Sequence, residues 1–162
     1  PIIFFQFLAI NPLFGLIDNY RQLPLRDASK FIIESMKPNE TIAMVGIKKP
    51  SIHFYTNKVI LYESNTNINV INLSERLSNE KRIGWKAHHI GSPNASNSLL
   101  IIIDNETSKL RHWKSLDPKE LGSFGIYNVW RVNILKLNEI ADKFKNQSKL
   151  NSSWREYNPE RY

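Results

Sequence analysis

Cysteine is absent from the 162-residue sequence, which excludes disulfide bonds, thiol nucleophiles and cysteine-ligated metal sites. No GxGxxG follows the first predicted strand, and neither a GxxxxGK[ST] phosphate loop nor a GxSxG elbow occurs. The usual signatures of dinucleotide-binding, P-loop and α/β-hydrolase enzymes are therefore missing. The adjacent pair His88–His89 has no carboxylate at a metal-binding spacing, so we expect surface or loop histidines there and no metal site.

Acidic residues are outnumbered: 15 Asp and Glu stand against 22 Lys and Arg, for a net charge of +7. This balance permits contact with phosphate groups of nucleic acid, anionic lipid or a phosphorylated lipid ligand. The basic residues are spread over the whole chain and do not gather with aromatic residues, so we expect no nucleic-acid partner. A hydrophobic content of 41% suits one domain with its own core.

No charge occurs before Asp18, so residues 1–17 form an apolar stretch. As a helix this stretch would be about 25 Å long, slightly short of a bilayer core. It is either a buried segment of a soluble core or the end of a transmembrane helix whose beginning is missing. We favour the second interpretation, because the stretch stops abruptly and is followed at once by Tyr20, Arg21 and Arg26.

Helical and strand-like periodicities alternate from residue 18 to residue 145. The predicted helices are 18–36 with Pro24 in its first turn, 51–57, 73–81 capped by Asn72 or Ser74, about two turns from Asp104 toward Trp113, a turn or short helix over 117–122, and 135–144. The predicted strands are 40–46, 58–62, a very short 70–73, 99–103 and 124–132, with a polar asparagine-rich loop at 63–69.

This alternation predicts an α/β fold, a three-layer sandwich with a mostly parallel sheet of about four or five strands. The continuous apolar run 99–103 is typical of a strand that is buried on both faces of a parallel sheet. The predicted organisation is the end of a transmembrane helix at 1–17, a soluble α/β domain at 18–145 and a polar tail at 146–162.

Two places in this predicted fold carry candidate site residues. Asp104 follows the strand 99–103, where it either contributes to a ligand site at the carboxyl edge of the sheet or caps the next helix. Lys48 and Lys49 follow another strand and precede a helix that starts near Ser51. Those lysines are either simply solvated or, with the helix amides, contact a phosphate or another anion. Tyr55 belongs to the core or exposes its hydroxyl to a ligand.

Three sequence segments resemble a known family: DNYRQLPLR at 18–26, directly after the apolar stretch, VGIKKPS at 45–51, and FYT at 54–56. They look like the C-terminal part of bacterial integral-membrane glycosyltransferases, similar to the protein mannosyltransferase and aminoarabinose transferase group. In that family, many transmembrane helices precede a soluble α/β domain on the extracytoplasmic, periplasmic side. A sugar is transferred with inversion from a polyprenyl-phosphate carrier, without a nucleotide sugar.

The resemblance implies that the catalytic carboxylate lies in an early loop among the membrane helices, so this chain contains no catalytic residue and no cofactor. Its implied partners are membrane lipid, the polyprenyl-phosphate sugar donor and the transmembrane portion of the same protein. Arg21 and Arg26 would meet lipid phosphate, Lys48, Lys49 and the Ser51 amide would form a second anion contact, and Tyr55 would bond the sugar. Two other readings stay open: a basic soluble module that binds nucleic acid or another anion, and a purely structural domain.

Overall fold

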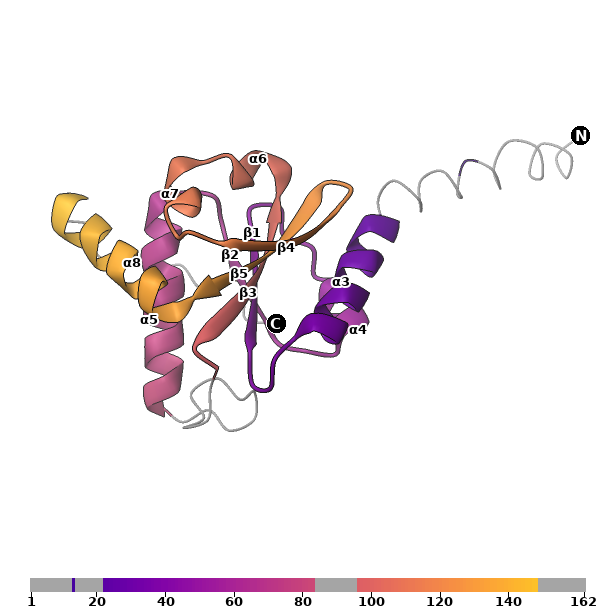
Figure 1. Cartoon of the computed structure of the whole chain (residues 1–162), viewed down its shortest axis with the longest axis horizontal. Helices are drawn as coiled ribbons and strands as arrows, with labels where there is room; N and C mark the ends of the chain where they lie inside the picture. The colour runs from indigo at the N-terminus through magenta and orange to yellow at the C-terminus, as the bar shows by residue number, and fades with distance from the viewer. Residues whose placement is uncertain (1–12, 14–21, 84–95, 149–162) are drawn as a thin grey trace, which may run out of the picture.

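The computed structural model describes residues 22–83 and 96–148, together with the single residue Leu13 (Figure 1). The predicted end of a transmembrane helix at residues 1–17 lies, apart from Leu13, outside these described residues. In the described part of the chain, no helix is both long and apolar enough to cross a bilayer. The prediction of a membrane helix at the start of the chain therefore remains a prediction.

Five strands form one sheet, in the order β2–β1–β3–β5–β4. Their bounds are β1 Thr41–Val45, β2 Ile60–Glu63, β3 Ser98–Asp104, β4 Lys119–Phe124 and β5 Tyr127–Asn133. β1 pairs in parallel with β2 and β3, whereas β5 pairs antiparallel with β3 and β4. Four of the five strands thus run in one direction and only β5 runs against them. The predicted α/β fold with a mostly parallel sheet of four or five strands is confirmed.

β3 is the central strand, and its apolar run is buried on both faces, as predicted. Leu99, Ile101 and Ile103 belong to one core cluster. Leu100 and Ile102 point the other way and belong to the second cluster. Because side chains alternate along a strand, an unbroken apolar run can serve two cores only when helices cover both faces of the sheet.

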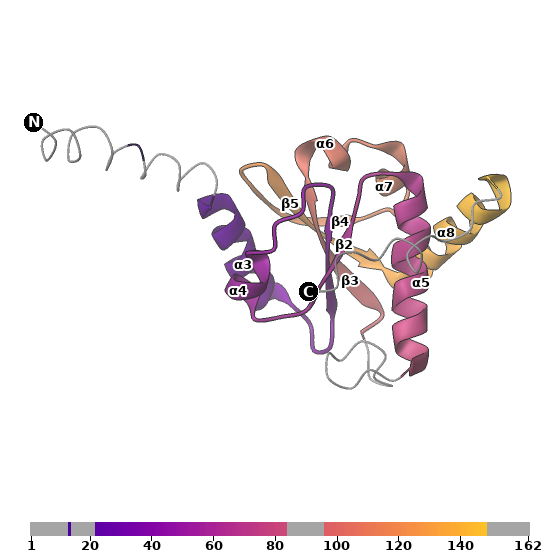
Figure 2. The ribbon, with the colours of Figure 1, turned by 180° about the vertical axis from the view of Figure 1, so that it is seen from behind.

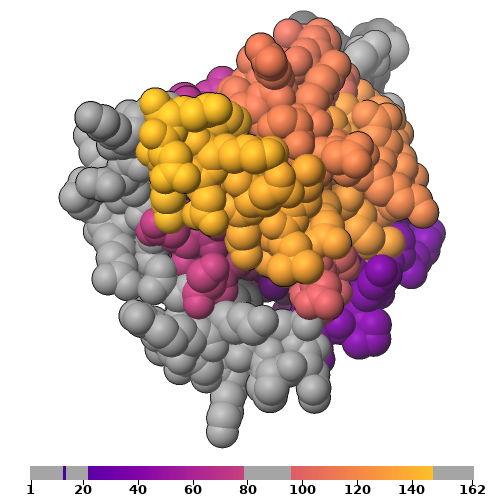
Figure 3. Space-filling model, turned by 60° about the vertical axis from the view of Figure 1, so that its left-hand side comes forward, coloured from indigo at the N-terminus to yellow at the C-terminus, as the bar shows by residue number. Residues whose placement is uncertain are grey.

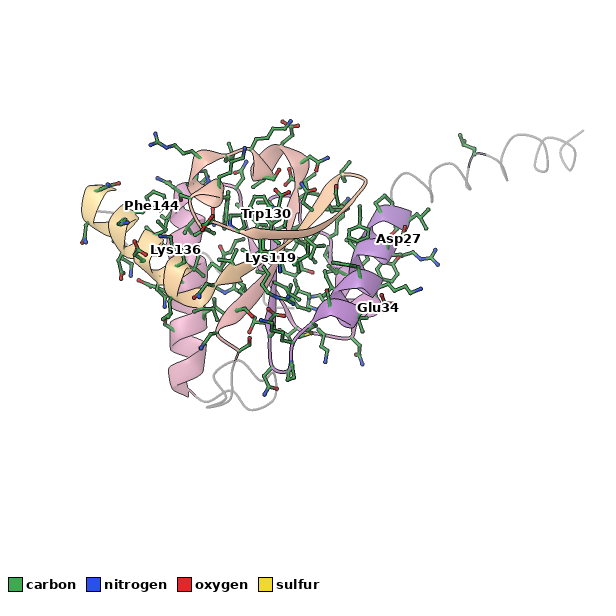
Figure 4. All side chains as sticks on the ribbon, in the orientation of Figure 1. Asp27, Glu34, Lys119, Trp130, Lys136 and Phe144 are labelled. Carbon is green, nitrogen blue, oxygen red and sulfur yellow. The ribbon has the colours of Figure 1, made fainter. Side chains whose placement is uncertain are left out.

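Helices cover both faces, so the predicted three-layer sandwich is also confirmed (Figures 1 and 2). The helices are α3 Leu23–Ser35, α4 Ile52–Thr56, α5 Asn67–Ile83, α6 Asn105–Ser108, α7 Arg111–Lys114 and α8 Ile134–Ser148. α3 and α4 pack on one face of the sheet. α5, α7 and α8 pack on the other face, where Trp130 lies in the interior and Phe144 of α8 packs against the same cluster (Figure 4).

α3 forms as its sequence predicts. Pro24 lies in the first turn, where its missing N–H would have no helical partner. Leu25, Ala28 and Ile32 recur at helical spacing and are buried. The helix ends at Met36, whose backbone is extended, with φ −64° and ψ 133°.

The start of α5 differs from the prediction of a loop over 63–69, a short strand over 70–73 and a helix capped by Asn72 or Ser74. One continuous helix begins at Asn67, so both predicted caps lie inside it. Thr66 Oγ1 donates to Asn69 Oδ1 at 2.6 Å, and this bond ties the asparagine-rich run into the helix start. Val70 and Ile71 are buried as helix residues and join the core beneath the sheet.

The segment predicted to turn over 117–122 is instead the strand β4, which forms a hairpin with β5. The predicted strand 124–132 is split by the turn between β4 and β5, where Gly125 has a φ of +59°. A substituent at Gly125 would come within 2.9 Å of Pro24, so the turn packs directly on the start of α3. β4 has an irregularity between Glu120 and Gly122, and none of its residues is fully buried, so its sequence carries no clear alternating pattern.

A buried ion pair joins β5 to Glu40, the residue before β1. Arg131 donates to both carboxylate oxygens of Glu40, at 2.8 and 3.0 Å, and to the Ser35 carbonyl at 2.7 Å. Burial alone would raise the pKa of Glu40. Hydrogen bonds from Arg131, the Lys37 amide and Ser98, with the Arg131 charge, outweigh burial and leave that pKa below its ordinary value.

Candidate functional site

The carboxyl ends of β1 and β3 lie side by side, because the two strands pair in parallel up to Val45 and Ile103. From β1 the chain crosses to β2 past α4 on one face of the sheet, and it returns to β3 past α5 on the other. Ligands of open α/β sheets bind at such a point, outside the carboxyl ends of the strands. Ligand-binding residues are therefore expected at this edge, which we call the carboxyl edge.

At the carboxyl edge, both oxygens of Asp104 are occupied by hydrogen bonds from the protein. Oδ1 accepts from the amides of Glu106 and Thr107, at 3.1 and 3.0 Å, and so caps α6. Oδ2 accepts from Thr107 Oγ1 at 2.7 Å and from the Ile47 amide at 3.1 Å. Burial would raise the pKa of Asp104, but these hydrogen bonds outweigh it and lower the pKa. The helix after Asp104 is shorter than predicted, because α6 stops and α7 begins anew at Arg111.

Gly46 makes the bond between Asp104 and Ile47 possible. Its φ is +85°, and a Cβ at this position would lie 1.9 Å from Asp104 Oδ2. Only glycine both adopts this backbone conformation readily and leaves room for the carboxylate. Asp104 thus links the β1–α4 loop to the end of β3, at the edge where α/β sheets commonly hold a ligand.

The predicted anion-binding residues lie in that same loop. Lys48 is exposed, Lys49 is partly exposed, and the Lys49 carbonyl accepts a hydrogen bond from the Tyr62 hydroxyl at 3.3 Å. Ser51 is the N-cap residue of α4 but makes no capping bond with its side chain. α4 has only five residues, so its dipole is small, and any attraction for an anion rests on the two lysine charges.

The remaining candidates lie on α3 and α4 or outside the described residues. The Tyr55 hydroxyl donates to Gln22 Oε1 at 3.1 Å, which joins α4 to the residue before α3. Arg26 is exposed on the first turns of α3. Arg21 falls outside the described residues. The structure therefore brings Asp104 together with the lysine loop, and it joins Tyr55 to the start of α3.

Glu63, at the end of β2, is a buried carboxylate that sequence reasoning assigned to a polar loop. It accepts from Arg76 at 2.7 Å and from Asn69 Nδ2 at 3.0 Å. Burial raises the pKa of Glu63, and the opposing effects of Arg76, Asn69 and the charge of Lys48 do not reverse that rise. Like Asp104, Glu63 is fully engaged within the fold.

A groove of about 690 Å³ lies on the face of the sheet that α5, α7 and α8 cover, between these three helices. Figure 3 looks onto the side where α8, in yellow, lies beside the orange and coral region that precedes it in the chain. The groove is lined mostly by polar or basic side chains, and Ile140 and Phe144 are its two apolar ones. The lining residues are Thr66, Asn67, Arg111, His112, Ser115, Ile140, Lys143, Phe144 and Gln147. No motif indicated this groove, because its residues come from three separate elements.

Within residues 22–83 and 96–148, no group of three or more histidine, aspartate or glutamate side chains lies close enough together to hold a metal ion. The pair His88–His89 falls between these ranges, so the prediction made for it stays a prediction. Elsewhere, His112 lies within hydrogen-bond distance of the Asn65 carbonyl, to which Trp113 Nε1 also donates at 3.1 Å.

Fold and site together define a three-layer α/β domain whose buried carboxylates hold the fold together and whose exposed candidate surfaces are basic or polar. Residues 35–148 match the family model of the cyanobacterial RgtA-type glycosyltransferase, C-terminal domain. The match spans more than half of the chain, and the chain belongs to this family. No curated protein and no solved structure matches it. The resemblance to the C-terminal part of membrane glycosyltransferases is thereby confirmed.

Proposed function

We propose that this chain is the C-terminal part of a membrane-anchored glycosyltransferase that transfers a sugar from a polyprenyl-phosphate carrier to a lipid or protein acceptor. The match of residues 35–148 to the RgtA-type C-terminal domain carries this proposal. The charge-free stretch 1–17, which ends a few residues before α3, supports a membrane anchor. We place the folded domain on the extracytoplasmic side, as the resemblance of residues 18–56 implies.

In this proposal the domain covers and supports the membrane site and does not catalyse transfer alone. The buried carboxylates that the structure describes are Glu40, Glu63 and Asp104. Each accepts several hydrogen bonds from its own chain, so none of them is placed to act as a base toward a substrate. The catalytic carboxylate would then belong to the membrane portion, and the domain itself would need no cofactor.

The contacts that we propose with the donor are electrostatic. Arg21 and Arg26, next to the anchor, would meet lipid phosphate. Lys48 and Lys49, with the Ser51 amide, would meet the phosphate of the donor. Tyr55 would reach the sugar after exchanging its bond to Gln22, since a hydroxyl both donates and accepts.

The test is sugar transfer by the full-length protein carrying Arg21→Ala or Lys48→Ala. Loss of a charge-assisted hydrogen bond to phosphate would weaken donor binding about tenfold. Lys136→Ala is the matched control, because Lys136 is a partly exposed lysine of α8 whose ion pair with Glu139 is also at the surface. Unchanged transfer and unchanged donor affinity in both variants would remove these contacts. Salt-dependent binding of nucleic acid to the wild-type chain would instead favour a nucleic-acid module.

A further inference from the structure

Three large apolar side chains are exposed at the carboxyl edge, on elements that contact one another. They are Leu23 at the start of α3, Ile47 after β1 and Ile126 in the β4–β5 turn, with 39%, 42% and 46% of their surfaces exposed. Two hydrogen bonds connect Ile47 with Ile126. The Ile47 amide donates to the Asp104 carboxylate, and the amide of Asn105, the residue after Asp104, donates to the Ile126 carbonyl at 3.0 Å.

The third apolar residue is connected through the β4–β5 turn. Pro24, next to Leu23, packs on Gly125, next to Ile126. Figures 1 and 2 show the same arrangement from opposite sides, with α6, the β4–β5 turn and the start of α3 at one end of the molecule. The apolar residues therefore form one patch drawn from three distant parts of the sequence, unlike isolated exposed apolar residues, which need no explanation.

Basic side chains flank this patch. The exposed basic residues on the elements around it are Arg26 on α3, Lys48 after Ile47 and Lys109 after α6. On the same elements, the exposed acidic residues near this end are Asp27, which Figure 4 shows on the outer side of α3, and Glu106. Glu106 is already paired with Lys109 at 2.7 Å. Three exposed cations thus stand beside the apolar centre against two exposed carboxylates, a combination of apolar and basic side chains that suits an interface with anionic lipid.

The chain also enters the fold at this end. α3 begins at Leu23, only a few residues after the charge-free stretch 1–17. An anchor at that stretch would hold the carboxyl edge within a few residues' length of the bilayer surface. The opposite end of the sheet differs, because its exposed apolar residue Leu135 lies beside Lys136 and Glu139, which are paired with each other.

We infer that the carboxyl edge docks on the anionic surface of the bilayer, with Leu23, Ile47 and Ile126 in the interface and Lys48 and its basic neighbours on lipid phosphates. This inference rests on the proposed membrane anchor and adds to it which face of the domain meets the lipid. Docking holds the lysine loop 46–51 at the height of the headgroups, where a lipid-linked phosphate lies.

Single-cysteine labelling tests the inference, because the chain has no cysteine of its own. The whole chain is reconstituted in vesicles of phosphatidylcholine with phosphatidylglycerol, and a fluorophore is attached at Ile47→Cys, Ile126→Cys or Leu135→Cys. Quenching is measured with a headgroup-region lipid quencher and with iodide in the water. We expect the lipid quencher to dominate at positions 47 and 126, and iodide to dominate at position 135.

Charge variants complete the test. The ratio of docked to undocked domains is measured from lipid quenching at position 126. Lys48→Gln should lower this ratio about fivefold, and Lys136→Gln should leave it unchanged. Vesicles of phosphatidylcholine alone should reduce the lipid quenching at position 126 as well. An unchanged melting temperature of each variant confirms that the fold is intact.

Equal iodide access at positions 126 and 135 in anionic vesicles would overturn the inference while leaving the anchor in place. Position 126 shielded from both quenchers would also overturn it, because protein and not lipid would then cover the edge. Failure of the wild-type chain to sediment with vesicles of either composition would remove the membrane anchor, and with it both the docking and the proposed function.

Discussion

Asp104 illustrates how one residue can look like a ligand-binding group and serve the fold instead. Its position after the strongest apolar strand predicted both a site residue and a helix cap, and the structure confirms the cap. The bond to Ile47 could not be predicted, because the two residues are 57 positions apart and meet only when β1 and β3 pair. The sequence alone therefore predicts that a carboxylate lies at the end of this strand, but it does not predict which groups bond to that carboxylate.

Replacing Asp104 should destabilise the domain. Asp104→Ala removes the cap of α6 and leaves the Ile47 amide without its acceptor, and we expect a loss of about 2–3 kcal/mol of unfolding free energy. Gly46→Ala should break the same contact by steric collision. If the two changes act on one contact, the double variant should lose less than the sum of the single losses in chemical denaturation. Asp142→Ala, on the exposed side of α8, is the control, and an equal loss there would contradict this role.

The pH dependence of stability should separate Asp104 from Glu63. The folded-state pKa of Asp104 is lowered, so its contribution is present above the ordinary carboxylate value and is lost as pH falls through the lowered value. The pKa of Glu63 is raised, so its contribution is present below the ordinary value and is lost as pH rises through the raised one.

We therefore expect the stability difference between wild type and Asp104→Asn to be large near neutrality and to shrink on acidification. Denaturation midpoints across a pH series measure this difference. A difference that stays constant down to the acid-unfolding range would show that ionisation of Asp104 does not matter to the fold.

Elements with a strong local pattern were predicted well, and those that depend on distant pairing were not. α3, β1, β3 and α8 follow their own periodicity, and the structure confirms them. α8 continues to Ser148, a little beyond the predicted start of the tail at residue 146. β4 is exposed and irregular, and only its pairing with β5 defines it as a strand. Asparagines disfavour helix in isolation, yet α5 starts among them, because tertiary burial of its apolar face overrides the local preference.

At the scale of elements, Arg131 holds β5 to the connection between α3 and β1. Arg131→Ala would leave Glu40 as a buried charge without its cation, and we expect a loss of about 3–5 kcal/mol. Lys143→Ala, which breaks an exposed pair with Glu139 on α8, should change stability by less than about 1 kcal/mol. Urea denaturation of both variants makes the comparison. Similar losses in the two would mean that the buried pair has no special structural role.

At the scale of the whole molecule, short sequence motifs indicate the family, whereas the surfaces of the domain are visible only in the folded structure. The motifs at 18–56 pointed to membrane glycosyltransferases, and the family match covers residues 35–148. The groove between α5, α7 and α8 and the apolar patch of the carboxyl edge could not be predicted, because each assembles residues from elements far apart in the sequence. Both belong to surfaces that only the folded domain creates.

The most direct measurement is sugar transfer from a polyprenyl-phosphate-linked donor, compared between the full-length membrane protein and the 162-residue chain alone. The account predicts transfer by the full-length protein with this donor, no transfer with a nucleotide sugar, and no transfer by the isolated chain with either. Transfer by the isolated chain, or a full-length protein that uses only the nucleotide sugar, would contradict it.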